Sequence, residues 1–93
     1  MEEIEKLKEM LEKSGMPFEE VEMNGGKQII YSYKGERILD AVCHSFSYGR
    51  EQGLLEIMGL LTEEESKYDD VAGWLTAKDV YSRIKRHYEK TRR

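Results

Sequence analysis

Two tight-turn signals constrain the fold of this chain more than any other feature of its sequence. The first is "NGG" at residues 24–26, because Asn and Gly tolerate the positive φ angles of short hairpin turns. Before it, Glu20 and Glu22 alternate with apolar residues, which is the pattern of a half-buried strand. The second signal is "KG" at residues 34–35. Together they predict a three-stranded antiparallel meander, with strands over residues 18–23, 27–33 and 36–44.

Helical periodicity predicts a first helix over residues 2–14. Ile4, Leu7 and Leu11 fall on one face of that helix at the spacing of an amphipathic helix. Gly15 follows in the position where a left-handed residue usually ends a helix.

The apolar stretch "GLLEIMGLL" predicts a second helix after the strands. Its apolar side chains share one helical stripe, formed by Leu54, Ile57, Met58 and Leu61. Gly53 and Gly59 each lower helix propensity by roughly 1 kcal/mol, so packing is expected to supply most of its stability. The acidic residues 62–70 are expected to form a solvated connection.

The last helix carries a complete start signature. Thr76 stands at the N-cap and Asp79 at the third helical position, a variant of the capping box. Leu75 and Val80 occupy the positions of a hydrophobic staple. These signals predict a helix from residue 77 to about residue 90.

The predicted order is α-β-β-β-α-α, an α+β fold in which helices pack on one face of the three-stranded meander. At 93 residues the chain is expected to form a single domain, residues 1–93. No apolar run approaches the ~20 residues of a membrane helix, and Cys43 is the sole cysteine. We therefore expect a cytoplasmic protein with no membrane association.

Residue types typical of catalysis are present but do not have catalytic spacing. "SYGREQG" matches neither a phosphate loop nor a nucleophile elbow. Adjacent residues of a strand point to opposite faces, which argues against a dyad of Cys43 and His44. His87 is the only other histidine, and residues 63–70 lack the spacing of a calcium loop. The sequence predicts no catalytic residue, no metal and no cofactor.

"SYGREQG" is interpreted instead as the beginning of the second helix, with Ser47 capping it and Gly49 easing the turn. The alternative is an anion or partner contact at this point. Its candidate contact residues are Phe46, Tyr48 and Arg50.

A basic face is predicted on the last helix, in a chain whose net charge is −4 and whose pI is about 5.2. Its members fall at i, i+3, i+7 and i+10 and are Arg83, Arg86, Lys90 and Arg93. One interpretation is a solvated face whose positive charge suits the helix C-terminus. The other is a contact patch for an acidic protein surface or a nucleic-acid backbone, of which the acidic pI disfavours the second.

Two sequence blocks carry a resemblance to known proteins. "SYGREQGLLE" at residues 47–56 and "GWLTA" at residues 73–77 resemble small uncharacterised proteins of phages and prophages of low-GC Gram-positive bacteria. The resemblance implies a prophage origin and the cytoplasm of a bacterial host, and no catalytic residues carry over. We therefore expect a small non-enzymatic prophage-type protein of unknown activity that binds an unknown protein partner or itself. The alternative is a nucleic-acid-binding accessory module that uses the basic C-terminal helix.

Overall fold

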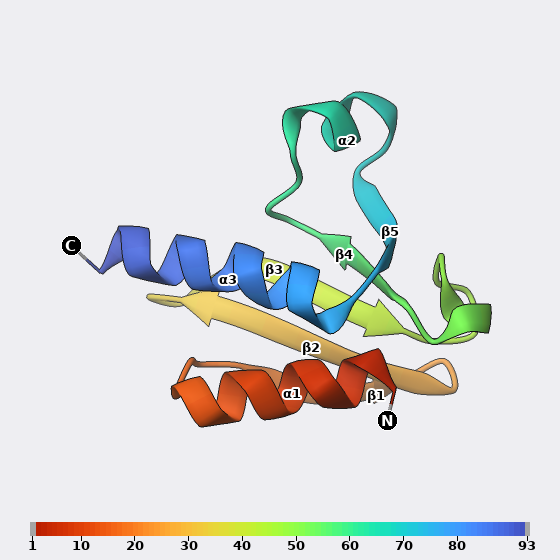
Figure 1. Ribbon diagram of the computed structural model, residues 1–93, viewed down its shortest axis with the longest axis horizontal. Coiled ribbons are helices and arrows are strands. Elements are labelled where there is room, and N and C mark those ends of the chain that lie inside the picture. The colour runs from red at the N-terminus through yellow and green to blue at the C-terminus, as the bar shows by residue number, and fades with distance from the viewer. Residues whose placement is uncertain (1, 93) are drawn as a thin grey trace.

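The computed structural model describes residues 2–92 and combines helices with an antiparallel sheet in an α+β arrangement (Figure 1). In chain order the elements are α1 (Glu3–Ser14), β1 (Glu19–Met23), β2 (Gly26–Tyr33), β3 (Glu36–Cys43), the 3-10 helix η1 (Arg50–Gln52), β4 (Leu55–Met58), α2 (Glu63–Tyr68), β5 (Val71–Leu75) and α3 (Ala77–Thr91). The five strands form one sheet in the order β1-β2-β3-β4-β5, and all neighbouring pairs are antiparallel.

Both predicted hairpin turns are confirmed. Asn24 and Gly25 have φ angles of 47° and 75°, and the strand register pairs Met23 with Gly26 across them. The turn at residues 34–35 repeats this geometry with φ angles of 52° and 80°. Two consecutive left-handed residues match the twist of the flanking strands, so local turn chemistry suffices to bring β1, β2 and β3 together.

The predicted second helix is wrong, because its apolar stretch contains β4, which pairs with β3. Leu55 and Ile57 are buried in the core, and the residue between them faces the other side of the sheet. Gly53 and Gly59 have φ angles of 72° and 94°, a left-handed conformation that ends a right-handed helix on either side. The apolar run fits a period of two as well as one of 3.6, and the glycine conformations decide for a strand.

The acidic segment after β4 is also more ordered than predicted. Thr62 begins α2 with a reciprocal capping box. Its hydroxyl accepts the Glu65 N–H at 3.1 Å, while Glu65 Oε1 accepts the Thr62 N–H at 2.9 Å. β5 then returns along β4, so the sheet has five strands where three were predicted. In Figure 1, α2 lies at the tip of this excursion, away from α1.

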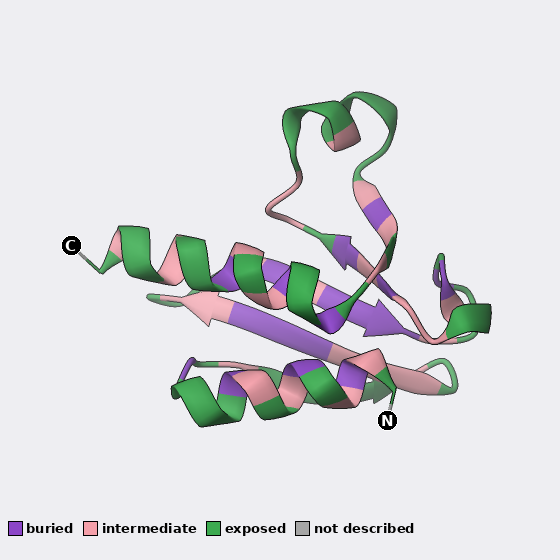
Figure 2. Cartoon of the chain, viewed as in Figure 1, coloured by how far each residue is buried: buried purple, intermediate pink, exposed green. Residues whose placement is uncertain are grey.

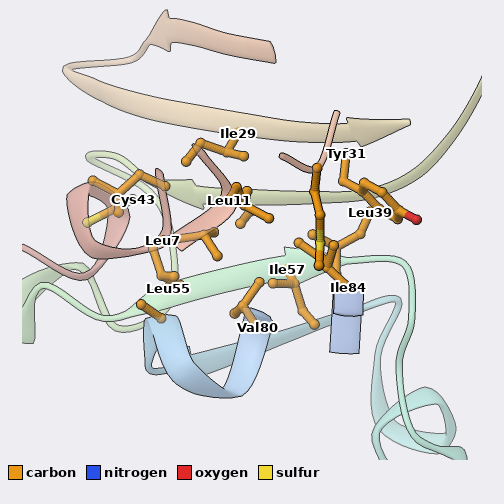
Figure 3. Close-up of a cluster of buried hydrophobic side chains, with 14 of the residues drawn as sticks. Leu7, Leu11, Ile29, Tyr31, Leu39, Cys43, Leu55, Ile57, Val80 and Ile84 are labelled. Atoms are coloured by element: carbon orange, nitrogen blue, oxygen red, sulfur yellow. The ribbon is translucent and has the colours of Figure 1, made fainter. Parts of the chain in front are cut away.

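The two long helices lie side by side on the same face of the sheet (Figure 1). Both were predicted, and their observed bounds agree with the predicted ranges to within one residue. Figure 3 shows side chains from the helices and from strands β2 to β4 meeting in one cluster. Its fully buried members include Leu7, Leu11, Ile29, Tyr31, Leu39, Leu55, Ile57, Val80 and Ile84. The outward surfaces of both helices are exposed (Figure 2).

Candidate functional site

The loop between β3 and η1 is closed by its own polar groups. The buried Ser47 hydroxyl accepts the His44 N–H and donates to the His44 carbonyl oxygen, both at 3.0 Å. The His44 ring accepts the Phe46 N–H on Nδ1 at 3.1 Å. With its backbone fixed in this way, Phe46 extends outward with 80% of its surface exposed. Ser47 therefore closes a loop and does not cap a helix, which corrects its predicted role.

A second exposed aromatic residue in this loop stacks on a residue from β5. The rings of Tyr48 and Trp74 are 5.3 Å apart between centroids and lie 19° from parallel. They remain 48% and 58% exposed, so each ring is covered on one side only. Glu56 of β4 accepts the Tyr48 N–H at 3.0 Å, which ties the loop to the sheet beneath it.

Glycines allow the two backbones to approach. A Cβ atom at Gly73 would stand 2.4 Å from the Tyr48 Cβ, and one at Gly49 would stand 3.1 Å from the Trp74 backbone nitrogen. Trp74 itself has a φ of 55°, a conformation that costs a residue with a side chain roughly 1–2 kcal/mol. The surrounding contacts must therefore hold Trp74 in place although its ring is not buried.

Phe46, Tyr48 and Trp74 form what we call the aromatic platform. Beside it lies a hollow of about 460 Å³, whose polar lining includes Arg50, Glu51 and Gln52. The Arg50 Nε is buried and, among residues 2–92, has no hydrogen-bond partner. Of the three contact residues predicted in this loop, the two aromatic ones are exposed on the platform and Arg50 lines the hollow.

Sequence reasoning misses Trp74 as a member of this site. Its segment, "VAGWL", was expected only to precede the last helix, and the strand that turns the indole toward Tyr48 was not predicted. The signal that could have identified it is the placement of Trp74 directly after Gly73, because glycine in a strand often marks a close backbone approach. Residues 47–56 and 73–77, the two blocks singled out in the sequence, thus meet in space through the Tyr48–Trp74 stack.

The predicted basic face of α3 is divided in the structure. The side chain of Arg83 is only 13% exposed, because its guanidinium makes a two-pronged pair with Glu65 at 2.7 and 2.8 Å. Hydrogen bonds from Arg83 lower the pKa of Glu65 to about 2. The Arg83 side chain is therefore not solvated, contrary to one of the two interpretations, and its role in partner binding stays a prediction. Arg86 and Lys90 are exposed as predicted, and Arg93 lies outside the described residues.

The side chains of Cys43 and of the two histidines lie in different surroundings. Cys43 is buried in the core, and burial raises the pKa of its thiol. His44 bonds to its own loop at the end of β3, whereas the His87 Nδ1 lies 2.9 Å from the Tyr31 hydroxyl. Over residues 2–92, no three His, Cys, Asp or Glu side chains gather where they could hold a metal ion.

Comparison with protein families, with curated proteins and with solved structures finds no match to this chain. Among the helices of residues 2–92, none has both the length and the apolar character that crossing a membrane requires.

Proposed function

We propose that this chain is a small non-enzymatic protein-interaction module that binds its partner through the aromatic platform. The observation that carries the proposal is the stack of Tyr48 on Trp74, two large rings that stay about half exposed and yet have a defined geometry. Phe46 adds a third exposed ring from the same loop. Exposed aromatic residues gathered in one place mark interaction surfaces in soluble proteins.

The chemistry of the platform suits a protein surface. Trp, Tyr and Arg supply most of the binding energy at protein interfaces, because they bury a large area at a small entropic cost. The stack and the Ser47 loop closure fix the rings before binding, which lowers the cost of ordering them. Glu51 and Glu56 add negative charge nearby, which would repel a phosphate backbone.

The resemblance to phage and prophage proteins adds that the partner is a component of a bacterial host or of the phage. A second copy of the chain is the other partner that the same surface would accept, since aromatic residues are also enriched at interfaces between identical chains.

Photo-crosslinking tests this proposal directly. A benzoylphenylalanine residue replaces Phe46 in one variant and Tyr68 in the other, and both are expressed in cells of the source organism. Tyr68 is the matched control, because it is 90% exposed on α2 but stands alone. We expect a discrete crosslinked product from position 46 and none from position 68. The mass of that product distinguishes a second copy from another protein.

The variant Trp74→Asn supplies the second measurement. Asn tolerates a positive φ, so the substitution removes the indole without adding backbone strain. We expect it to reduce the crosslinked product from position 46 at least tenfold while circular dichroism stays unchanged. Equal products from positions 46 and 68, or a product that Trp74→Asn leaves intact, would contradict the proposal.

A further inference from the structure

A second surface lies at the opposite end of α3 from Trp74. A groove of about 460 Å³ separates the C-terminal half of α3 from the segment that joins β4 to α2. One wall of the groove is apolar and consists of Leu60 and Leu61. The other wall is the helix, which presents Arg86, His87 and Lys90. The groove therefore has an apolar side and a cationic side.

The apolar wall is fixed to α3 before anything binds. Arg83 Nη1 donates to the Leu60 carbonyl oxygen at 3.1 Å, and the same guanidinium is paired with Glu65. Leu60 has a φ of 53°, and a Cβ atom at the preceding Gly59 would stand 2.1 Å from the Ile38 carbonyl oxygen. A leucine held in the left-handed region is strained, so these contacts specify one position for the wall. A preformed wall lowers the entropic cost of binding.

The cationic wall carries charge that the protein does not neutralise. α3 has five Lys and Arg residues against two acidic ones, in a chain whose net charge is −4. Arg83 is paired with Glu65, but within residues 2–92 no carboxylate oxygen lies within 4.0 Å of a side-chain nitrogen of Arg86 or Lys90. The His87 Nδ1 lies 2.9 Å from the hydroxyl of the buried Tyr31, and this contact fixes the His87 ring at the helix side of the groove.

We propose that this groove binds an extended acidic peptide with the pattern acidic–apolar–acidic. Arg86 and Lys90 are one helical turn apart, about 6 Å along the axis. Alternate side chains of an extended peptide are roughly 7 Å apart and point the same way, so two carboxylates can meet the two cations. The residue between them points in the opposite direction, toward Leu60 and Leu61. The cationic wall thus contacts one face of the extended peptide, and the apolar wall contacts the other.

Selection from a peptide library tests this inference. The full chain is immobilised and panned against random nine-residue peptides, and the selection is repeated with the double variant R86E/K90E. The matched control is K78E/K85E, which changes the net charge equally on exposed positions of α3 that do not line the groove. We expect the acidic–apolar–acidic triplet to be enriched at least tenfold on the wild type and on K78E/K85E, and not on R86E/K90E.

Fluorescence anisotropy then measures the most enriched peptide in solution. We expect at least tenfold weaker binding to R86E/K90E and less than twofold change for K78E/K85E and for Trp74→Asn, which affects only the aromatic platform. Circular dichroism monitors the fold, and R86Q/K90Q replaces the charge-reversed variant if that variant unfolds. Absence of the triplet from the wild-type pool overturns the proposal. So does tighter binding of a 20-nucleotide DNA strand than of the peptide at the same salt concentration.

Discussion

The two capped helices of this protein begin in the same way but are held in place by different forces. Thr62 in α2 and Thr76 in α3 each accept the N–H of the residue three positions on, whose carboxylate accepts the Thr N–H in return. From there the helices diverge. α3 has fifteen residues and buries Ala77, Val80 and Ile84, whereas α2 has six and buries none.

A capping box therefore sets the residue at which a helix begins, but it does not hold that helix against the rest of the protein. A helix of six residues has too few hydrogen bonds to be stable in water alone. The contact that joins α2 to α3 is the pair of Glu65 with Arg83, and the same Glu65 carboxylate completes the cap on Thr62. The side-chain hydrogen bonds that hold α2 against α3 are therefore polar, whereas α3 is held by its buried side chains.

The largest effect is expected where α3 meets the core. Ile84→Ala removes a fully buried side chain from the cluster beneath both long helices, and we expect the free energy of unfolding to fall by about 3 kcal/mol. Urea denaturation measures the loss. Ser82→Ala, at an exposed position on the same helix, is the control and should change stability by less than about 0.5 kcal/mol. A loss below about 1 kcal/mol for Ile84→Ala would show that α3 is not held by burial.

Removing the pair of Glu65 with Arg83, which joins α2 to α3, should have the next largest effect on stability. Arg83→Ala deletes three hydrogen bonds, two of them to a carboxylate, and we expect a loss of about 2 kcal/mol. Amide hydrogen exchange should accelerate in residues 63–68 and remain slow in residues 80–84. Lys85→Ala, at the exposed position two residues along α3, should leave both segments unchanged. Equal acceleration of hydrogen exchange in both segments would show that α2 and α3 do not differ in how they are held.

Low pH should weaken the pair of Glu65 with Arg83 without a mutation. The pKa of Glu65 is about 2 in the folded protein and close to 4.5 when unfolded, because Arg83 stabilises the charged carboxylate. The contribution of this pair is therefore complete above pH 4.5 and is lost as the pH falls toward 2. The stability difference between the wild type and Arg83→Ala should shrink over this interval, as measured by urea denaturation at each pH. A difference that stays constant between pH 5 and pH 2 would contradict the assigned pair.

The predictable parts of this fold are those specified by residues close together in the sequence. The turn at residues 24–26, the glycine that ends α1 and the Thr76–Asp79 cap each act over five residues or fewer, and each was predicted correctly. Phe46 and Tyr48 were also named as candidate contact residues, and both are exposed, although their role in binding stays a prediction.

The parts that could not be predicted depend on contacts between distant residues. The apolar run of β4 forms a strand because it pairs with β3. β5 in turn forms a strand because it pairs with β4. Arg83 fits the helical pattern of a solvated face, but Glu65, eighteen positions away, binds its guanidinium in a part-buried ion pair. Trp74 becomes part of the candidate site only once β5 places it against Tyr48.

A smaller effect is expected from the cap of α3. Thr76→Ala removes the acceptor for the Asp79 N–H and should lower the free energy of unfolding by about 1 kcal/mol. The helix itself stays docked, because Val80 and Ile84 remain buried. Thr76→Ser keeps the hydroxyl and is the control in urea denaturation. A midpoint equal to that of the wild type would show that this cap contributes nothing.

The smallest effect is expected from the matching cap of α2. Thr62→Ala alone should cost about 0.5 kcal/mol, the low end for caps, because α2 buries no side chain and Arg83 still holds Glu65. On the Arg83→Ala background the same substitution should cost less than about 0.3 kcal/mol, since a detached α2 has already frayed. Thr76→Ala should keep its full effect on that background. If Thr62→Ala and Thr76→Ala both keep their full effect on the Arg83→Ala background in urea denaturation, a contact other than Arg83 holds α2 in place.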